Sequence, residues 1–188
     1  MARSNQSQFA LLGLLSFGAM SGYDLRQLSG WSVGHFWRES YGQIYPTLKK
    51  MAAEDLVHRK TEVNPGRPDR HIYELTAAGR KELYRWLERP PTVEVPRNEL
   101  LLKLFFGGLV PPRVSAEHVA QRREQCRQEL ATYRATRERL EKEAPKDPQK
   151  PFWLMTLNYG EHIARAEANW CDETLKELGE KKRQTKRN

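Results

Sequence analysis

The sequence has few of the side chains on which catalysis and metal binding depend. It contains only two cysteines, Cys126 and Cys171, each at an apolar position of a helical stretch and without a nearby histidine. This spacing fits no zinc site, and we expect both thiols to be small buried hydrophobes. The five histidines lie in separate segments, and no HExxH motif, glycine-rich phosphate loop or serine nucleophile turn occurs. We therefore expect neither an enzyme nor a bound metal or cofactor.

Long apolar runs are also lacking. No stretch approaches the ~20 residues that span a membrane, and residues 1–8 lack the basic-then-apolar order of a secretory signal. We expect a cytoplasmic protein without a membrane partner. The net charge of +8 favours a polyanionic partner, although residues 179–188 alone hold five Lys or Arg against one Glu. This basic tail has no apolar residue, so we expect it to be disordered.

Three helices are predicted in the first 56 residues. Residues 9–17 are nearly all apolar and suit a buried helix. The segment Ser21-Gly22-Tyr23-Asp24 has the form of a capping box for a helix that ends near Gly30. Ser40 and Gln43 form a second such box, and the helix that follows has apolar residues at helical spacing, namely Ile44, Leu48 and Met51.

An alternating pattern then replaces the helical one. Residues 57–63 and 71–75 read as two strands, and the turn residues of 64–69 join them as a hairpin with a basic tip. Thr76 can cap a fourth helix, with Leu83, Trp86 and Leu87 on its apolar face. The order of three helices, hairpin and helix is complete within residues 1–89.

The second half predicts a helical hairpin. Residues 90–114 read as a proline-rich linker and a connecting helix, and residues 115–178 as two long antiparallel helices of ~40 Å, the first capped by Ser115. Heptad spacing places Val119, Cys126, Tyr133 and Leu140 on the first helix, and Leu154, Leu157, Glu161, Ala164, Ala168, Cys171, Leu175 and Leu178 on the second.

Two helices have too little interior to bury both apolar stripes, so we expect a homodimer formed through them. Arg123, Arg137 and Glu161 occupy core-type heptad positions. They either set the register or pair with each other across that dimer interface, or they remain partly exposed charges at its edge.

The predicted fold class is therefore mainly α with a small β-hairpin: an N-terminal winged helix-turn-helix followed by a dimerising helical hairpin. In such a domain the third helix enters the DNA major groove and the hairpin flanks it. The outward face of that helix carries Gly42, Pro46, Lys49, Lys50 and Ala53. Small residues allow close approach to a duplex, and lysines contact phosphates. Pro46 removes one backbone donor, so the first turn is expected to be tightened or displaced.

The candidate DNA-binding residues lie at three places: the start of the second helix, the third helix with the residue before it, and the wing. They are Tyr23, Ser40, Tyr41, Gln43, Tyr45, Lys49, Lys50, Lys60, Arg67 and Arg70. Three roles stay open. Gln43 could read an adenine edge or serve the cap, and Tyr23 could bind a phosphate or lie in the core. The two wing arginines could enter the minor groove or belong to a solvated turn. An alternative function is protein docking through the winged domain, which would favour a neutral face.

The residues resemble the PadR family of bacterial transcriptional regulators. The motif of its recognition helix is matched by Ser40, Gly42, Gln43, Ile44, Tyr45, Pro46 and Leu48, and its Ser-Gly-Tyr-Asp-Leu segment by residues 21–25. The resemblance covers about residues 8–178 and includes the long C-terminal region of one branch of the family. One departure is Asp55, where the family usually has a glycine that ends the third helix; Asp tolerates a left-handed turn better than most residues.

The resemblance implies a dimeric repressor in the bacterial cytoplasm, associated with the nucleoid, that binds a palindromic operator in double-stranded DNA. It also implies release by a small-molecule effector, such as a phenolic acid or a toxic lipophilic compound. In the family the effector tends to bind between the winged domain and the C-terminal helices. The candidate effector residues here are aromatic or polar: Trp37, Phe152, Trp153, Tyr159 and His162.

Overall fold

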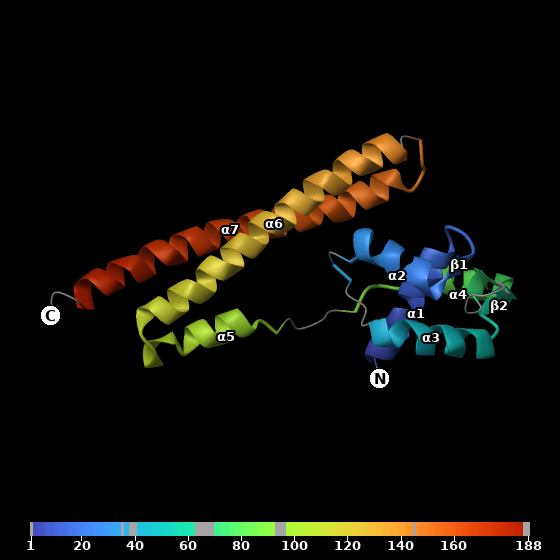
Figure 1. Cartoon of the computed structure of the whole chain (residues 1–188), viewed down its shortest axis with the longest axis horizontal. Coiled ribbons are helices and arrows are strands. Elements are labelled where there is room, and N and C mark those ends of the chain that lie inside the picture. The colour runs from blue at the N-terminus through green and yellow to red at the C-terminus, as the bar shows by residue number, and fades with distance from the viewer. Residues whose placement is uncertain are drawn as a thin grey trace. The chain divides into compact units, whose positions relative to one another are not determined.

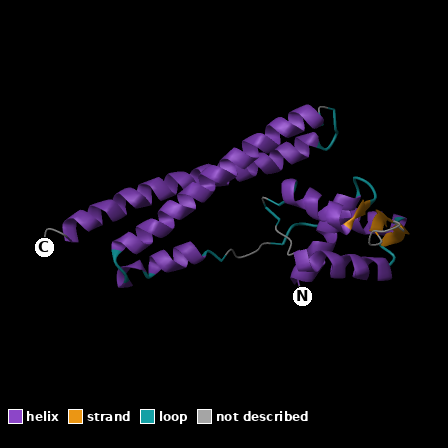
Figure 2. Ribbon diagram, viewed as in Figure 1, coloured by secondary structure: helices purple, strands orange, loops and turns teal. Residues whose placement is uncertain are grey.

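The computed structural model describes residues 2–34, 36–37, 41–62, 70–92, 97–144 and 146–185. The chain divides into an N-terminal unit, Met1–Val93, and a C-terminal unit, Glu94–Asn188. Within the described ranges, no helix is both long enough and apolar enough to cross a membrane. Figure 1 labels the elements along the chain, and Figure 2 shows that helices make up most of both units.

The N-terminal unit has the element order of a winged helix-turn-helix. It contains α1 (Ala2–Leu15), β1 (Met20–Ser21), α2 (Gly22–Trp31), α3 (Tyr41–Ala53), β2 (Val57–Glu62), β3 (Arg70–Leu75) and α4 (Ala77–Leu87). The predicted wing strands pair antiparallel as β2 and β3, and their tip lies outside the described residues. The predicted winged fold is therefore confirmed.

The predicted helix boundaries rest on caps that form in the structure. The Ser21 hydroxyl accepts a hydrogen bond from the Asp24 N–H, and the Asp24 carboxylate accepts one from the Ser21 N–H, which completes the capping box of α2. Thr76 caps α4 by accepting from the Gly79 N–H at 2.9 Å. Asp55 has the left-handed φ of 53° that its place after α3 predicted.

A third strand joins the wing. The two residues of β1 pair antiparallel with β3, with Met20 opposite Tyr73 and Ser21 opposite Ile72, and the sheet order is β1-β3-β2. Two residues are too few to give an alternating pattern, so the sequence did not predict β1. This short strand attaches the start of α2 to the inner strand of the wing.

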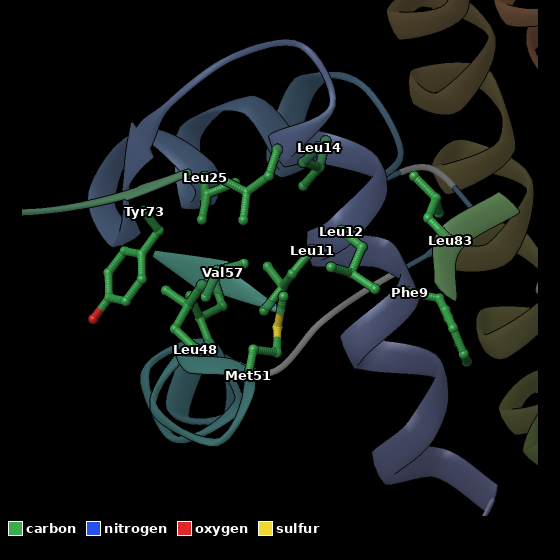
Figure 3. Packing of buried hydrophobic residues seen from close by; sticks show 12 residues of the cluster. Phe9, Leu11, Leu12, Leu14, Leu25, Leu48, Met51, Val57, Tyr73 and Leu83 are labelled. Atoms are coloured by element: carbon green, nitrogen blue, oxygen red, sulfur yellow. The ribbon is translucent and has the colours of Figure 1, made fainter. Parts of the chain in front are cut away.

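The core of the N-terminal unit forms around the leucines of α1. Leu11 and Leu12 are fully buried, and Figure 3 shows them among Leu25 of α2, Met51 of α3 and Leu83 of α4. Burial of each such side chain away from water stabilises the fold by roughly 1.5–3 kcal/mol. The apolar stripe predicted for the third helix is thus confirmed as its inward face.

Pro46 does not distort α3 as expected. The helix is continuous from Tyr41 to Ala53 with Pro46 inside it, so the expected tightening of its first turn is wrong. The proline lies close to the helix start, where only one backbone hydrogen bond of the ladder is lost.

The C-terminal unit contains α5 (Glu99–Phe105), the 3₁₀ turn η1 (Gly107–Leu109), α6 (Pro112–Glu143) and α7 (Lys150–Thr185). The two long helices lie side by side as an antiparallel hairpin (Figure 1). Of the predicted heptad positions on α6, all four are buried, and on α7 the buried ones are Leu157, Glu161, Ala164 and Cys171.

Three helices have limits that differ from the predictions. The first helix was predicted over residues 9–17, but α1 begins at Ala2 and ends at Leu15. The first long helix begins at Pro112, so Ser115 is a buried residue of its first turn and not its cap. Proline at the first helical position has no N–H to satisfy and a fixed φ that suits a helix start. The basic tail was expected to be disordered from residue 179, yet residues 179–185 continue α7. Lys, Arg, Glu and Gln are good helix formers that extend an existing helix at low cost.

Candidate nucleic-acid interface

The helix α3 presents one apolar and one polar face. Ile44, Thr47, Leu48 and Met51 are buried. We call the exposed residues between them the recognition face: Gly42, Gln43, Tyr45, Pro46, Lys49 and Lys50. This face combines small residues, hydrogen-bonding side chains and cations, which suits close contact with a duplex. Gln43 is exposed, while its proposed capping partner Ser40 lies outside the described residues, as does the Tyr41 side chain.

The two lysines of the recognition face differ in their surroundings. Lys50 lies 3.7 Å from the carboxylate of Glu54, one turn further along the helix. Such a surface pair is worth less than about 1 kcal/mol, so it can give way to a phosphate. Lys49 has no ion-pair partner among the residues that the structure describes. Lys49 is therefore the stronger candidate for a permanent phosphate contact.

Two exposed tyrosines, Tyr23 of α2 and Tyr45 of α3, lie near the start of α2. Tyr23 is 59% exposed, which rules out the alternative that it is a core residue, and its hydroxyl accepts a hydrogen bond from Gln27 Nε2 at 2.9 Å. That bond leaves the hydroxyl hydrogen of Tyr23 available for an acceptor such as phosphate. Tyr45 is equally exposed, and its ring lies against Gly22, where an added Cβ would stand 2.6 Å from Cε1. Gly22 thus allows the start of α2 to approach the recognition face.

The two predicted wing cations that the structure describes, Lys60 and Arg70, are held by carboxylates. Lys60 Nζ of β2 donates to Glu74 of β3 at 3.0 Å, and this bond together with the Lys60 charge lowers the pKa of the Glu74 carboxyl. Arg70 Nη2 donates to Asp24 Oδ2 of α2 at 2.6 Å. The third predicted wing cation, Arg67, lies outside the described residues. Lys60 and Arg70 are therefore both oriented by contacts within the N-terminal unit.

Asp24 and Glu74 are the site residues that sequence reasoning missed. Glu74 could have been found, because Lys60 and Glu74 are diagonal neighbours on one face of the predicted hairpin. Asp24 was recognised only as a capping residue, and no local pattern connects it with Arg70, 46 residues away. Burial raises the pKa of the Asp24 carboxyl, but hydrogen bonds from Ser21 and Arg70 outweigh it and lower the pKa below its usual value.

The charged core positions of the hairpin pair within one chain. Arg137 donates to Glu161 at 2.9 Å, and Arg123 donates to Asp172 at 2.9 Å, in both cases from α6 to α7. Two of the three residues, Arg137 and Glu161, therefore pair with each other, but within the chain; pairing across a dimer interface stays a prediction. Glu161 is buried, so its ion pair with Arg137 helps to fix the register of α6 against α7.

Cys126 and Cys171 are fully buried in this hairpin, as predicted. Burial raises the pKa of the Cys126 thiol to about 11, and the pKa of the Cys171 thiol is raised for the same reason. Within the described ranges, no three metal-ligating side chains lie close enough together to hold an ion.

The effector candidates are spread over two units. Trp37 is half-buried in the N-terminal unit, and Trp153 packs against the buried core of the hairpin. Phe152, Tyr159 and His162 are exposed on α7. The first two of these share one face, since they are seven residues apart.

The winged helix-turn-helix with a basic recognition face places this protein among the DNA-binding regulators. The C-terminal helical hairpin restricts it to those regulators in which a long helical region follows the winged domain. Residues 11–85 match the model of the PadR-like family of transcriptional regulators, and residues 96–179 match that of the virulence activator alpha C-terminal region. The chain belongs to the PadR family of transcriptional regulators.

Known relatives extend over most of the chain. The negative transcriptional regulator PadR of Bacillus subtilis is 27% identical over 162 residues, which cover 86% of each chain. The crystal structure of Bacillus subtilis PadR in complex with operator DNA has a TM-score of 0.76 at 26% identity and covers 91% of this chain and 98% of that one. In complex with p-coumaric acid the same protein gives 0.72 at 26% identity, with 92% and 98% covered. The Vibrio cholerae virulence activator AphA also gives 0.72, at 28% identity, with 92% and 98% covered.

Proposed function

We propose that the protein is a dimeric regulator that binds a palindromic operator, with the recognition face of α3 in the major groove and the wing beside it. The observation that carries this proposal is the composition of that face, where Gly42 and Pro46 alternate with Gln43, Lys49 and Lys50. The Bacillus subtilis relative solved with operator DNA supports it. The alternative function, protein docking, would favour a neutral face, whereas the exposed face of α3 carries Lys49 and Lys50.

The dimer is supported by a second apolar face on α7. One stripe of this helix packs on α6, but a different stripe, composed of Phe152, Met155, Tyr159 and Ile163, is at least half exposed. These side chains recur at three- and four-residue spacing, so they form a continuous surface along the helix. An exposed apolar stripe of this kind is typical of a protein interface, and a second copy of the hairpin is the partner that twofold symmetry offers.

We further propose that the protein is a repressor that a small aromatic effector releases from DNA. Two facts about the Bacillus subtilis relative support this part: it is a negative transcriptional regulator, and its structure has been solved with p-coumaric acid. Trp37, Phe152, Trp153, Tyr159 and His162 remain the candidate effector residues. Release is tested by adding p-coumaric acid and other hydroxylated aromatic acids to the protein–DNA complex and following fluorescence polarisation of the labelled duplex.

DNA binding is tested by enrichment of duplexes from a randomised pool with the full-length protein, followed by salt titrations on the enriched duplex. Replacing Lys49 with alanine should weaken binding about tenfold and lower the slope of log affinity against log salt by about one, because one phosphate contact is lost. Lys81→Ala, an exposed lysine on α4, is the matched control and should change neither value. Unchanged affinity and slope for Lys49→Ala would exclude the proposed docking face.

A further inference from the structure

The carboxylate of Asp24 receives donors from two segments that are far apart in the sequence. Its Oδ2 atom accepts from the Ser21 N–H at 3.0 Å, from the Ser21 hydroxyl at 2.8 Å and from Arg70 Nη2 at 2.6 Å. Ser21 is the last residue of β1 and the N-cap of α2, while Arg70 begins β3, the inner strand of the wing. A single oxygen therefore connects the two elements that are expected to contact DNA.

The connection is reinforced by the backbone. Ser21 also pairs with Ile72 in the β1–β3 ladder, so the start of α2 and the first residues of β3 are joined both by the sheet and by a charged bond. Charge-assisted hydrogen bonds are about twice as strong as neutral ones and fix the orientation of a guanidinium.

The guanidinium of Arg70 is only partly used by this contact. Its side chain is 49% exposed, and within the described part of the chain Asp24 is its sole ion-pair partner. Four of its five N–H bonds are free of that contact, since arginine carries five donors in a rigid fork. Exposed Tyr23 lies next to Asp24 in sequence and offers a further hydroxyl donor. The arrangement is that of an arginine held from behind, with donors left for an anion.

We propose that Asp24 is a positioning residue for DNA binding, which holds Arg70 at the tip end of β3 so that its remaining N–H groups meet a backbone phosphate beside α2. The inference rests on the proposed function and adds a residue to it. Asp24 itself carries the wrong charge to contact a phosphate, so it acts only through Arg70. A released arginine would sample many rotamers and lose part of its binding free energy to ordering.

The test compares Arg70→Ala, Asp24→Asn and the double variant on the duplex enriched by the wild-type protein. Each single variant should bind about tenfold more weakly and lower the salt slope by about one, because the same phosphate contact is lost in both. The double variant should bind no more weakly than Arg70→Ala, since the two residues act as one unit.

Ser21→Ala separates positioning from helix capping. It removes the hydroxyl that caps α2 but leaves the Asp24–Arg70 bond, so it should lower the melting temperature and change operator affinity less than twofold. All variants are measured well below their melting temperatures, with circular dichroism as the check on folding.

Three results would overturn the inference: Asp24→Asn binding as tightly as wild type or more tightly, additive losses in the double variant, or a loss for Ser21→Ala equal to that for Asp24→Asn. If one of these occurs while Lys49→Ala still weakens binding, the proposed function stands without this inference. If the wild-type protein enriches no duplex, both proposals fail together.

Discussion

Gly79 shows how one residue sets the approach of two elements. It lies in the first turn of α4, where a Cβ would overlap the carbonyl oxygen of Leu56. That carbonyl accepts the backbone N–H of Thr76 at 3.2 Å and cannot move away without losing this bond. The close contact between the end of the α3–β2 corner and the start of α4 therefore requires glycine at this position.

Replacing Gly79 with alanine should lower the free energy of unfolding by about 1–3 kcal/mol, because the added methyl group forces the backbone apart. Urea unfolding followed by circular dichroism measures the change. Gly13→Ala is the matched control, since Gly13 is helical and a Cβ there would meet no atom within 4 Å. Alanine should there be neutral or stabilising by up to about 1 kcal/mol. Equal effects at the two positions would contradict the steric argument.

The thiol of Cys126 should be inert in the folded protein. It is fully buried and its pKa is raised to about 11, so almost no thiolate exists near neutral pH. A chromogenic disulfide reagent at pH 8 should react with neither cysteine until denaturant is added, and then with both. Rapid labelling of the native protein would contradict the assignment of these residues to the hairpin core.

Cross-helix ion pairs are the main polar contacts of the α6–α7 element. Arg122 donates to Glu167 through Nε at 2.8 Å and Nη2 at 2.6 Å, and through Nη1 to Glu129 at 2.9 Å. The hydrogen bonds from Arg122 lower the pKa of the Glu167 carboxyl, although partial burial acts in the opposite direction. The two-point geometry orients α6 and α7 relative to each other in a way that apolar packing alone does not.

Because the pKa of Glu167 is lower in the folded state, its contribution is fully present above the unfolded value of about 4.3 and is lost as pH falls through the folded value. Glu167→Gln should therefore cost about 1–2 kcal/mol at pH 7, and less as pH falls below about 4.3. The control is Glu143→Gln in the exposed Arg139–Glu143 pair, which should cost under about 0.5 kcal/mol. A loss for Glu167→Gln that stays the same down to pH 3 would contradict the ionic origin.

The features of the helices that depend on local sequence patterns could be predicted from the sequence. The capping box at Ser21, the cap at Thr76 and the heptads of the hairpin need only residues a few positions apart, and the structure confirms them. What the sequence did not predict depends on distant partners: the two-residue strand β1, and the Asp24–Arg70 bond. The exposed residues of α3 were predictable as a face, because helical periodicity assigns their direction without knowledge of the partner.

For the whole molecule, the amount of exposed apolar surface bears on assembly. Besides the α7 stripe, the segment from α5 to η1 exposes large side chains, with Phe105 at 81% and Leu109 at 84%. A large apolar side chain presents on the order of 150–250 Å². The α7 stripe and this segment together therefore offer about the 800 Å² that each partner contributes to a standard interface. A monomer would leave this surface in water, at a cost of about 25 cal/mol per Å².

The double variant Tyr159→Glu with Ile163→Glu places two carboxylates on the α7 stripe, so it should convert the proposed dimer into a monomer in sedimentation equilibrium. Neither side chain belongs to the buried core of the hairpin, so the helical circular dichroism signal should persist. Operator affinity should fall at least a hundredfold, because a monomer engages only one half-site and loses the second contact set. Asn158→Glu, an exposed polar position on the same helix, is the control and should stay dimeric. A double variant that remained dimeric with unchanged affinity would remove the α7 stripe from the interface and leave the α5–η1 segment as the surface to test next.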